Sequence, residues 1–247
     1  MPYPITVLTL FPEMILQAVS HSIIGRAIGN EILDIKVLDI RDFATDKHKT
    51  VDDEPYGGGA GMVMKVDVVV AAIREAKKAS QGAKVVLMSA SGRPFNQAVA
   101  KRYASHLGGI ILVCGHYEGV DERVAAHYVD EEVSVGDFVL SGGEIPALAI
   151  LDATARLLPG VLGNAESLDV ESHENGLLES PQYTRPQVFE GHEVPAVLLS
   201  GNHKEIELFR TKEAIEKTKR MRPDIKLQLE PEPPPMQLGR PRELDNG

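Results

Sequence analysis

The sequence predicts an α/β protein with a mostly parallel sheet flanked by helices, followed by a small helical domain. The first observation is a set of short apolar runs, typical of strands that are buried on both faces: Ile5–Leu10, Ile35–Ile40, Lys84–Ser89 and Ile110–Cys114. The second is a set of helical patterns that lie between or after these runs: Val68–Ala79, Asn96–His106 and Ile145–Leu158. This alternation indicates a parallel sheet, because parallel neighbours need a long crossover, usually a helix.

The segment Val133–Pro146 has the most informative local pattern. It reads VSVGDFVLSGGEIP, in which a strand-like apolar run meets the pair Gly142–Gly143 and a helix then opens. Paired glycines at the start of a helix let a ligand approach the main chain closely, since no Cβ is present and the first N–H groups are unpaired. The segment therefore predicts a cofactor pocket lined by backbone. Its glycines do not follow G-x-G-x-x-G, which argues against a Rossmann dinucleotide site.

The carboxyl-terminal part is expected to form a linker and a second domain. Leu158–Gly160 ends the preceding helix, because proline disfavours the α conformation in the residue before it and glycine supplies a turn. Asn202, with Glu205 three residues later, predicts a capped helix start, and Pro223 predicts its end. The apolar stripe of this helix comprises Ile206, Phe209, Ala214 and Ile215. We expect a first domain over 1–160, a flexible linker over 161–177, and a helical domain with a proline-rich tail over 178–247.

Composition and charge narrow the class of protein. A formal net charge of −10 argues against broad, nonspecific binding to nucleic acid. The stretch Gly201–Arg222 nevertheless has seven basic residues against four acidic ones, which predicts either a local basic surface or a solvated helix with i,i+4 ion pairs. The single cysteine, Cys114, excludes an internal disulfide and a thiol metal cluster. The apolar runs are too short and too polar for a membrane span, and the amino-terminal segment lacks the basic start of a signal peptide, so we expect a cytoplasmic protein with no membrane partner.

Four glycine-rich or polar loops follow strand-like runs: Tyr56–Met62, Met88–Arg93, Gly115–Arg123 and Ser134–Glu144. Ligands of open α/β sheets collect at the carboxyl ends of the strands, where such loops lie. The first loop is not a phosphate-binding Walker loop, because Gly61 is followed by Met62 and not by lysine. Together, the small residues of these loops predict a cleft of main-chain donors and acceptors that suits an adenine ring and a ribose.

Four long motifs occur in order along the chain: HKTVDDEPYGGGAGMVMK (His48–Lys65), LVCGHYEGVDERV (Leu112–Val124), SVGDFVLSGGEIPALAILDATARLLPGVLGN (Ser134–Asn164) and GLLESPQYTRP (Gly176–Pro186). They resemble motifs of the bacterial tRNA (guanine-N1)-methyltransferase family, TrmD, and the resemblance extends to about Lys219. It implies a SPOUT-class fold with a deep trefoil knot that binds S-adenosylmethionine (S-adenosyl-L-methionine). The implied reaction is methylation of N1 of guanosine 37, beside the tRNA anticodon. The implied partners are tRNA and a second copy of the chain, with active sites at the interface of the homodimer.

The resemblance also implies the binding residues. The expected cofactor contacts are Met88, Ser89, Ala90, Ser91, Gly92, Gly115, Tyr117, Glu118, Ser134, Val135, Gly136, Phe138, Leu140, Gly142, Gly143 and Pro146. The expected contacts to the linker and the target guanine are Tyr56, Gly58, Gly59, Glu179, Tyr183 and Arg185. The target base should leave its stack, because its Watson–Crick edge is otherwise out of reach.

The implied catalytic pair is an arginine and a carboxylate. The arginine matches Arg156, and the family's aspartate opens a pattern that reads ESHENGLL here, so that Glu171 stands at its position. Guanine N1 carries a proton at neutral pH and cannot attack the methyl group until a base removes that proton. An arginine near O6 would stabilise the negative charge that then develops. Asp169, two residues earlier, is the second candidate for the base.

The change from aspartate to Glu171, together with the acidic net charge, leaves two other functions open. One is a catalytically silent knotted dimer that binds RNA or a small ligand. The other is a SPOUT enzyme that methylates the ribose 2′-hydroxyl. The sequence also leaves open whether Mg²⁺ takes part and which tRNA isoacceptors are substrates. No protein-bound metal site is expected from its residues.

Overall fold

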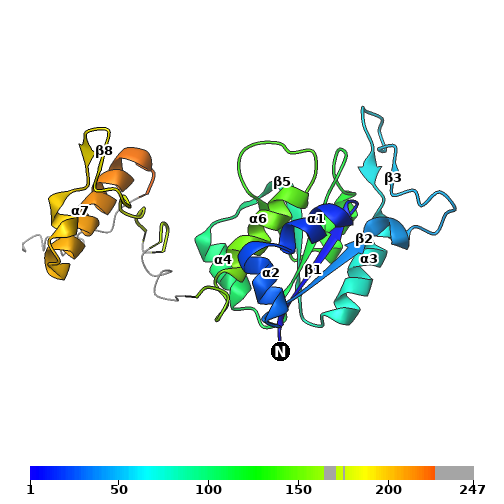
Figure 1. Cartoon of the computed structure of the whole chain (residues 1–247). Coiled ribbons are helices and arrows are strands. Elements are labelled where there is room, and N and C mark those ends of the chain that lie inside the picture. Colours follow the sequence, from blue (N-terminus) through cyan, green and yellow to red (C-terminus); the bar gives the residue numbers. More distant parts are fainter. Residues whose placement is uncertain (164–170, 175, 226–247) are drawn as a thin grey trace, which may run out of the picture. The chain divides into compact units, whose positions relative to one another are not determined.

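The computed structural model describes residues 1–163, 171–174 and 176–225. The chain divides into two compact units, Met1–Leu168 and Asp169–Gly247, which are drawn in Figure 1 and treated separately below. Asp169, residues 164–170 and 175 of the expected linker, and the proline-rich tail lie outside the described residues. Within the described part of the chain, no helix combines the length and the apolar character that a membrane span requires.

The first unit is built on one five-stranded sheet with strand order β2-β1-β6-β5-β7, and every pairing is parallel. The strands are β1 (Tyr3–Thr9), β2 (Leu33–Asp39), β5 (Lys84–Pro94), β6 (Ile110–Cys114) and β7 (Glu131–Ser134). The predicted parallel sheet is therefore confirmed, and β6 has the predicted bounds. The strand-like run expected from Val133 is wrong beyond Ser134, because residues 135–143 form a loop before the next helix begins.

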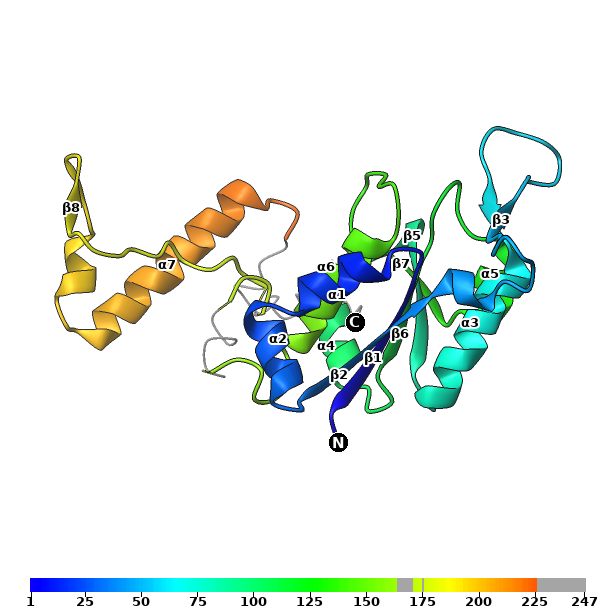
Figure 2. The same cartoon turned by 45° about the vertical axis from the view of Figure 1, so that its right-hand side comes forward.

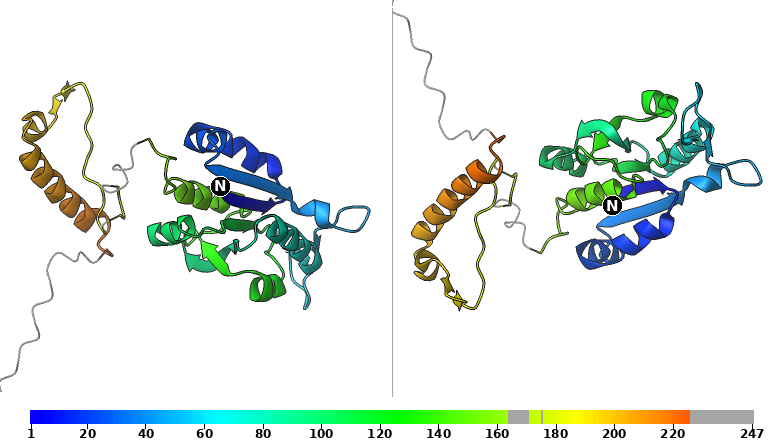
Figure 3. Two further views of the ribbon diagram at one scale, coloured as in Figure 1. Left: turned by 90° about the horizontal axis from the view of Figure 1, so that it is seen from below. Right: turned by 90° about the horizontal axis from the view of Figure 1, so that it is seen from above.

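Helices cover both faces of this sheet (Figures 2 and 3). One face carries α1 (Pro12–Val19), α2 (Ser22–Gly29), α4 (Gln97–Ala104) and α6 (Glu144–Ala155), and the other carries α3 (Val66–Ala79), α5 (Glu122–Tyr128) and the 3₁₀ turn η1 (Ile40–Phe43). Side chains of β6 alternate between the two cores: Ile110, Leu112 and Cys114 join the first, and Ile111 and Val113 join the second. This alternation explains why every residue of the strand is apolar and buried.

The core of the first unit continues past the expected domain boundary. Leu158 and Val161 are buried and belong to the core cluster that contains α6. The expected flexible linker from residue 161 is therefore wrong at its first position, since burial of this valine fixes the chain to the sheet domain.

A small antiparallel ribbon projects from the sheet domain, in light blue in Figure 3. It consists of β3 (Asp52–Asp53) and β4 (Val63–Met64), joined by the glycine-rich loop predicted at 56–62. Three consecutive glycines, Gly57 to Gly59, have positive φ angles of 88°, 76° and 136°. Only glycine adopts such values without strain, which explains the glycine run.

The second unit contains one long helix and a short hairpin. Helix α7 (His203–Met221) begins after Asn202, whose side chain accepts a hydrogen bond from the Glu205 N–H, and it ends before Pro223 as predicted. The hairpin of β8 (Val188–Phe189) and β9 (His192–Glu193) and the 3₁₀ turn η3 (Ala196–Leu199) were not predicted, so the expectation of a purely helical domain is wrong. The two turn residues of this hairpin both have positive φ, which suits a tight hairpin turn.

Candidate functional site

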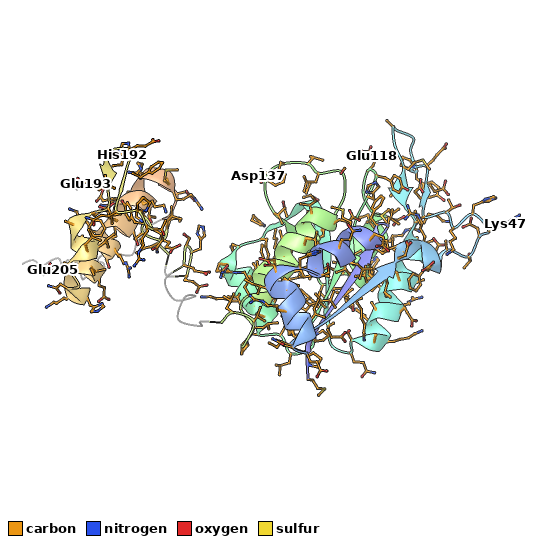
Figure 4. All side chains as sticks on the ribbon, viewed as in Figure 1. Lys47, Glu118, Asp137, His192, Glu193 and Glu205 are labelled. Carbon is orange, nitrogen blue, oxygen red and sulfur yellow. The ribbon has the colours of Figure 1, made fainter. Side chains whose placement is uncertain are left out.

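A cavity of about 410 Å³ lies at the carboxyl ends of β5, β6 and β7. Residues 88–91, 115–120, 134–136 and 138–143 line it together with the first turn of α6. All of the expected cofactor contacts except Gly92 line it. Loops that are far apart in the sequence therefore meet at the edge of the sheet where ligands of parallel sheets bind. Figure 4 shows Glu118 and Asp137 on two of these loops, at the same edge of the first unit.

Gly92 is the one expected cofactor contact that does not line this cavity. It lies in a bulge of β5, where pairing with β7 shifts register between Met88 and Arg93. A Cβ at Gly92 would lie 2.5 Å from the main-chain nitrogen of Val133, so glycine is needed for close packing of the two strands. Gly92 lines a separate hollow behind the bulge. The bulge turns Ser89 to Ser91 out of the regular ladder and into the cavity wall.

The glycine pair at the start of α6 fits tightly against the end of β6. A Cβ at Gly143 would lie 2.7 Å from Cα of Cys114, and a Cβ at Gly142 would lie 2.8 Å from Nδ1 of His116. The expectation that these N–H groups are unpaired is wrong for Gly143, which donates a hydrogen bond of 2.8 Å to the carbonyl oxygen of Gly115. The glycines thus join two cavity walls through their main chains.

The loop from Ser134 to Gly143 is shaped by its first residue. Ser134 Oγ donates to the carbonyl oxygen of Gly136 at 2.9 Å and receives a hydrogen bond of 3.2 Å from the Gly136 N–H. A Cβ at Gly136 would lie 2.4 Å from the ring of Phe138, so the ring packs directly over the glycine. Phe138 is 55% exposed, which places an apolar surface at the cavity rim.

The ribbon of β3 and β4 is attached to the second cavity wall. The Glu118 N–H donates to the carbonyl oxygen of Met62 at 3.0 Å, and the Met64 N–H donates to the carbonyl oxygen of Gly119 at 2.9 Å. Burial first, and secondarily the Asp52 carboxylate of β3, raise the pKa of the Tyr117 hydroxyl. The expected substrate residues Tyr56, Gly58 and Gly59 therefore lie on a loop carried by the cavity wall, and the Tyr56 side chain is fully exposed.

A buried carboxylate next to the cavity was not predicted. Glu144, the first residue of α6, is only 4% exposed and accepts a hydrogen bond of 2.7 Å from Oγ1 of Thr9. Burial, and secondarily the charge of Glu144, raise the pKa of the Cys114 thiol well above its usual value. A glutamate directly after Gly-Gly in an otherwise apolar segment was the available signal, but a partner 135 residues away cannot be read from the sequence.

The expected catalytic residues belong to different units. Arg156 is the C-cap of α6 in the first unit, and its N–H donates to the carbonyl oxygen of Asp152 at 3.1 Å. Glu171 and Glu179 line a cavity of about 540 Å³ in the second unit. A neighbouring hollow of the same unit is lined by Tyr183 and Arg185.

No cluster of three or more histidine, cysteine or acidic side chains is arranged to hold a metal ion within residues 1–163, 171–174 and 176–225.

The family model for tRNA (Guanine-1)-methyltransferase TrmD matches residues 3–228. The chain belongs to this family. Among curated relatives, the tRNA (guanine-N(1)-)-methyltransferase of Myxococcus xanthus is 54% identical over 224 residues, which cover 91% of this chain and 90% of the relative. The enzyme of the same name from Clostridium beijerinckii is 54% identical over 221 residues, covering 90% and 91%. That of Methylococcus capsulatus is 54% identical over 220 residues, covering 89% and 87%.

Membership of the tRNA (guanine-N1)-methyltransferase family confirms the resemblance inferred from the motifs. The match spans the sheet domain and α7, so both units belong to the family architecture.

Proposed function

We propose that this protein transfers the methyl group of S-adenosylmethionine to N1 of guanosine 37 in tRNA. The observation that carries the proposal is the glycine-walled cavity at the carboxyl ends of β5, β6 and β7 in a chain of the tRNA (guanine-N1)-methyltransferase family. Its volume of about 410 Å³ falls within the range of pockets that hold small ligands. We also propose that the first unit contains a trefoil knot and that the protein is cytoplasmic.

The cavity residues fit the cofactor. The absence of a Cβ at Gly142 and Gly143 lets α6 approach the end of β6 closely, so that main-chain atoms of both elements line the cavity. Main-chain groups of the three loops are available to an adenine and a ribose, and the exposed rings of Tyr117 and Phe138 offer apolar contacts at the rim. When bound, S-adenosylmethionine supplies an electrophilic methyl group on a sulfonium sulfur. The expected cofactor contacts other than Gly92 are the residues that would hold it.

The acid–base work falls to Glu171 and Arg156. Glu171 removes the proton from guanine N1, which frees the nitrogen lone pair for attack. Arg156 donates hydrogen bonds to O6, where negative charge gathers as the proton leaves. Asp169 remains the second candidate for the base.

The substrate side of the proposal uses both units. Tyr56, Gly58 and Gly59 would face the extruded base, and Glu179, Tyr183 and Arg185 would hold the segment around it. The basic residues of α7 other than Lys217 would contact phosphates, since a local positive surface suffices for specific contacts in an acidic protein.

A homodimer would bring the two units of different chains to one active site. Helices α1 and α6 contact each other, and their exposed apolar side chains support such an interface: Met14, Leu16 and Ile145.

The test is methyl transfer from labelled S-adenosylmethionine to tRNA transcripts with guanosine or adenosine at position 37. We expect labelled N1-methylguanosine only with guanosine 37, and loss of transfer in Glu171→Gln. Transfer that survives Glu171→Gln but disappears in Asp169→Asn would assign the base to Asp169. Label on ribose, or tight RNA binding without transfer under all conditions, would contradict the proposed reaction.

A further inference from the structure

The segment that carries Glu171 is fastened to α7 by side chains to which the proposed reaction gives no role. Glu171, residues 177–180 and Gln182 line the cavity of about 540 Å³ together with α7. Glu171 lines this cavity opposite Ile206 and Ala214 of the helix. The placement of Glu171 therefore depends on how its segment is held against α7.

Thr218 provides the first attachment. It is 0% exposed, and its Oγ1 donates to the carbonyl oxygen of Ala214 at 2.7 Å and accepts a hydrogen bond of 2.8 Å from the Leu178 N–H. One hydroxyl thus uses both its donor and an acceptor in the interior. Loss of the hydroxyl would leave the Leu178 N–H without this partner, which is costly for a part-buried group.

Lys217 provides the second attachment. Its Nζ donates to the carbonyl oxygen of Glu179 at 2.9 Å. The Glu179 N–H in turn donates to Oγ of Ser172 at 2.9 Å, and Ser172 is the next residue after Glu171. The loop between them is closed by a hydrogen bond of 2.8 Å from the His173 N–H to the carbonyl oxygen of Leu177. A continuous chain of hydrogen bonds therefore joins α7 to the residue beside Glu171.

We propose that Thr218 and Lys217 are positioning residues that set the location of the Glu171 carboxylate. The inference rests on the proposed function, in which Glu171 is the base. A base must lie within hydrogen-bond reach of the proton it removes, and a displacement of about 1 Å can reduce the rate about 100-fold. Because α7 also carries basic residues, these hydrogen bonds attach the segment of the base to the helix proposed to contact RNA. The ammonium of Lys217 serves the segment and not the RNA backbone.

The test is single-turnover methylation with saturating tRNA and S-adenosylmethionine, which reports the chemical step apart from binding. We expect Thr218→Val to lower the rate constant about tenfold or more, because the segment shifts, and tRNA affinity to stay within about twofold. Thr218→Ser keeps the hydroxyl and should retain a rate within about twofold of the wild type.

Ser200→Ala is the matched control within the same unit. Ser200 Oγ donates to the carbonyl oxygen of Val197 at 2.8 Å and accepts from the Asn202 N–H at 3.1 Å, so it makes the same two kinds of hydrogen bond as Thr218 without touching the Glu171 segment. Because Ser200 is exposed whereas Thr218 is buried, Ser200→Ala should lower the melting temperature less than Thr218→Val, and it should leave the rate constant unchanged.

Lys217→Met tests the second attachment and serves if Thr218→Val does not fold. We expect a rate reduction of about threefold to tenfold at saturating tRNA, with recovery in Lys217→Arg. Wild-type rates in both Thr218→Val and Lys217→Met, while Glu171→Gln is inactive, would overturn the positioning role and leave the base assignment standing. A wild-type rate in Glu171→Gln would overturn both.

Discussion

Replacing Gly143 with alanine tests whether the proposed cofactor cavity depends on the close approach of α6 to β6. The backbone of Gly143 is already right-handed helical, with φ of −82°, so alanine meets no conformational barrier there. The new Cβ would instead lie 2.7 Å from Cα of Cys114, 2.9 Å from N of Gly115 and 3.0 Å from Cβ of Met88. Two of these atoms, Cα of Cys114 and N of Gly115, belong to the main chain at the end of β6 and cannot move away by a side-chain rotation.

The magnitude follows from these distances. Ordinary contact begins at 3.4 Å, so α6 and β6 must separate by roughly 0.7 Å at this point. Overpacking of this kind costs about 1–3 kcal/mol. For a domain of this size each kcal/mol lowers the melting temperature by about 2–4 °C, so we expect a decrease of about 2–12 °C.

The separation should also distort the hydrogen bond between Gly143 and Gly115 and move the cavity wall. We expect binding of S-adenosylmethionine to weaken about tenfold or more, equivalent to about 1.4 kcal/mol. Thermal unfolding followed by circular dichroism and equilibrium dialysis with labelled cofactor measure the two effects.

Gly29→Ala is the control, because a Cβ at this exposed position in α2 has no neighbour within 4 Å. It should stabilise the protein by about 0.4–1 kcal/mol through loss of unfolded-state entropy. A Gly143→Ala variant that matches the wild type in melting temperature and cofactor affinity would refute the packing argument.

Three further predictions concern buried and titrating groups. Thr9→Val removes the hydrogen bond to the buried Glu144 and should reduce the free energy of unfolding by about 1.5–3 kcal/mol in urea titrations. Thr6→Val is the control, because the Thr6 hydroxyl is buried and makes no hydrogen bond to the described residues. This change should reduce the free energy of unfolding much less. The Cys114 thiol, buried and raised in pKa, should resist iodoacetamide at pH 8 in the native protein and react only in denaturant, as read by mass spectrometry; rapid native labelling would contradict its burial. Asp121 caps α5, and the hydrogen bond from the arginine two residues later lowers the pKa of the Asp121 carboxyl. Its contribution to the free energy of unfolding is therefore fully present above the unfolded pKa of about 3.9. It is lost as the pH falls through the lower pKa of the folded state. Asp121→Asn keeps the cap and should flatten the decline of the urea midpoint between about pH 5 and about pH 3; an unchanged slope would show that this carboxylate does not contribute.

The sheet could be predicted because its central strands are buried on both faces. A continuous apolar run such as Ile110–Cys114 leaves little ambiguity about where a strand begins and ends. Strand β7 lies at the edge of the sheet and includes Glu131 and Glu132. Because these residues are polar, the start of the strand was not predicted from the sequence. Helix α1 was missed because its start has no side-chain cap and is marked only by Pro12.

The cavity could be predicted in outline because glycines mark places where the main chain must be approached closely. What the glycines approach could not be predicted. Gly143 packs against β6, and Gly92 packs against β7, so part of the glycine pattern serves strand and helix packing rather than a ligand. The partner of Glu144 was hidden for the same reason, since Thr9 comes from the other end of the sheet domain's sequence.

The proposed roles of Glu171 and Arg156 came from a resemblance, not from periodicity or spacing. The hydrogen bonds from α7 to the Glu171 segment join residues about 40 positions apart, and a local pattern gives no indication of them.

Main-chain construction of the cavity has a consequence for inhibitors. A compound that bonds to the peptide groups of residues 115 and 142–143 would address atoms that no side-chain exchange removes. A resistance substitution at Gly142 or Gly143 would place a Cβ in space that neighbouring atoms already fill. It would therefore destabilise the protein before it prevented the compound from binding. Resistance should therefore arise slowly against ligands that bind these main-chain groups.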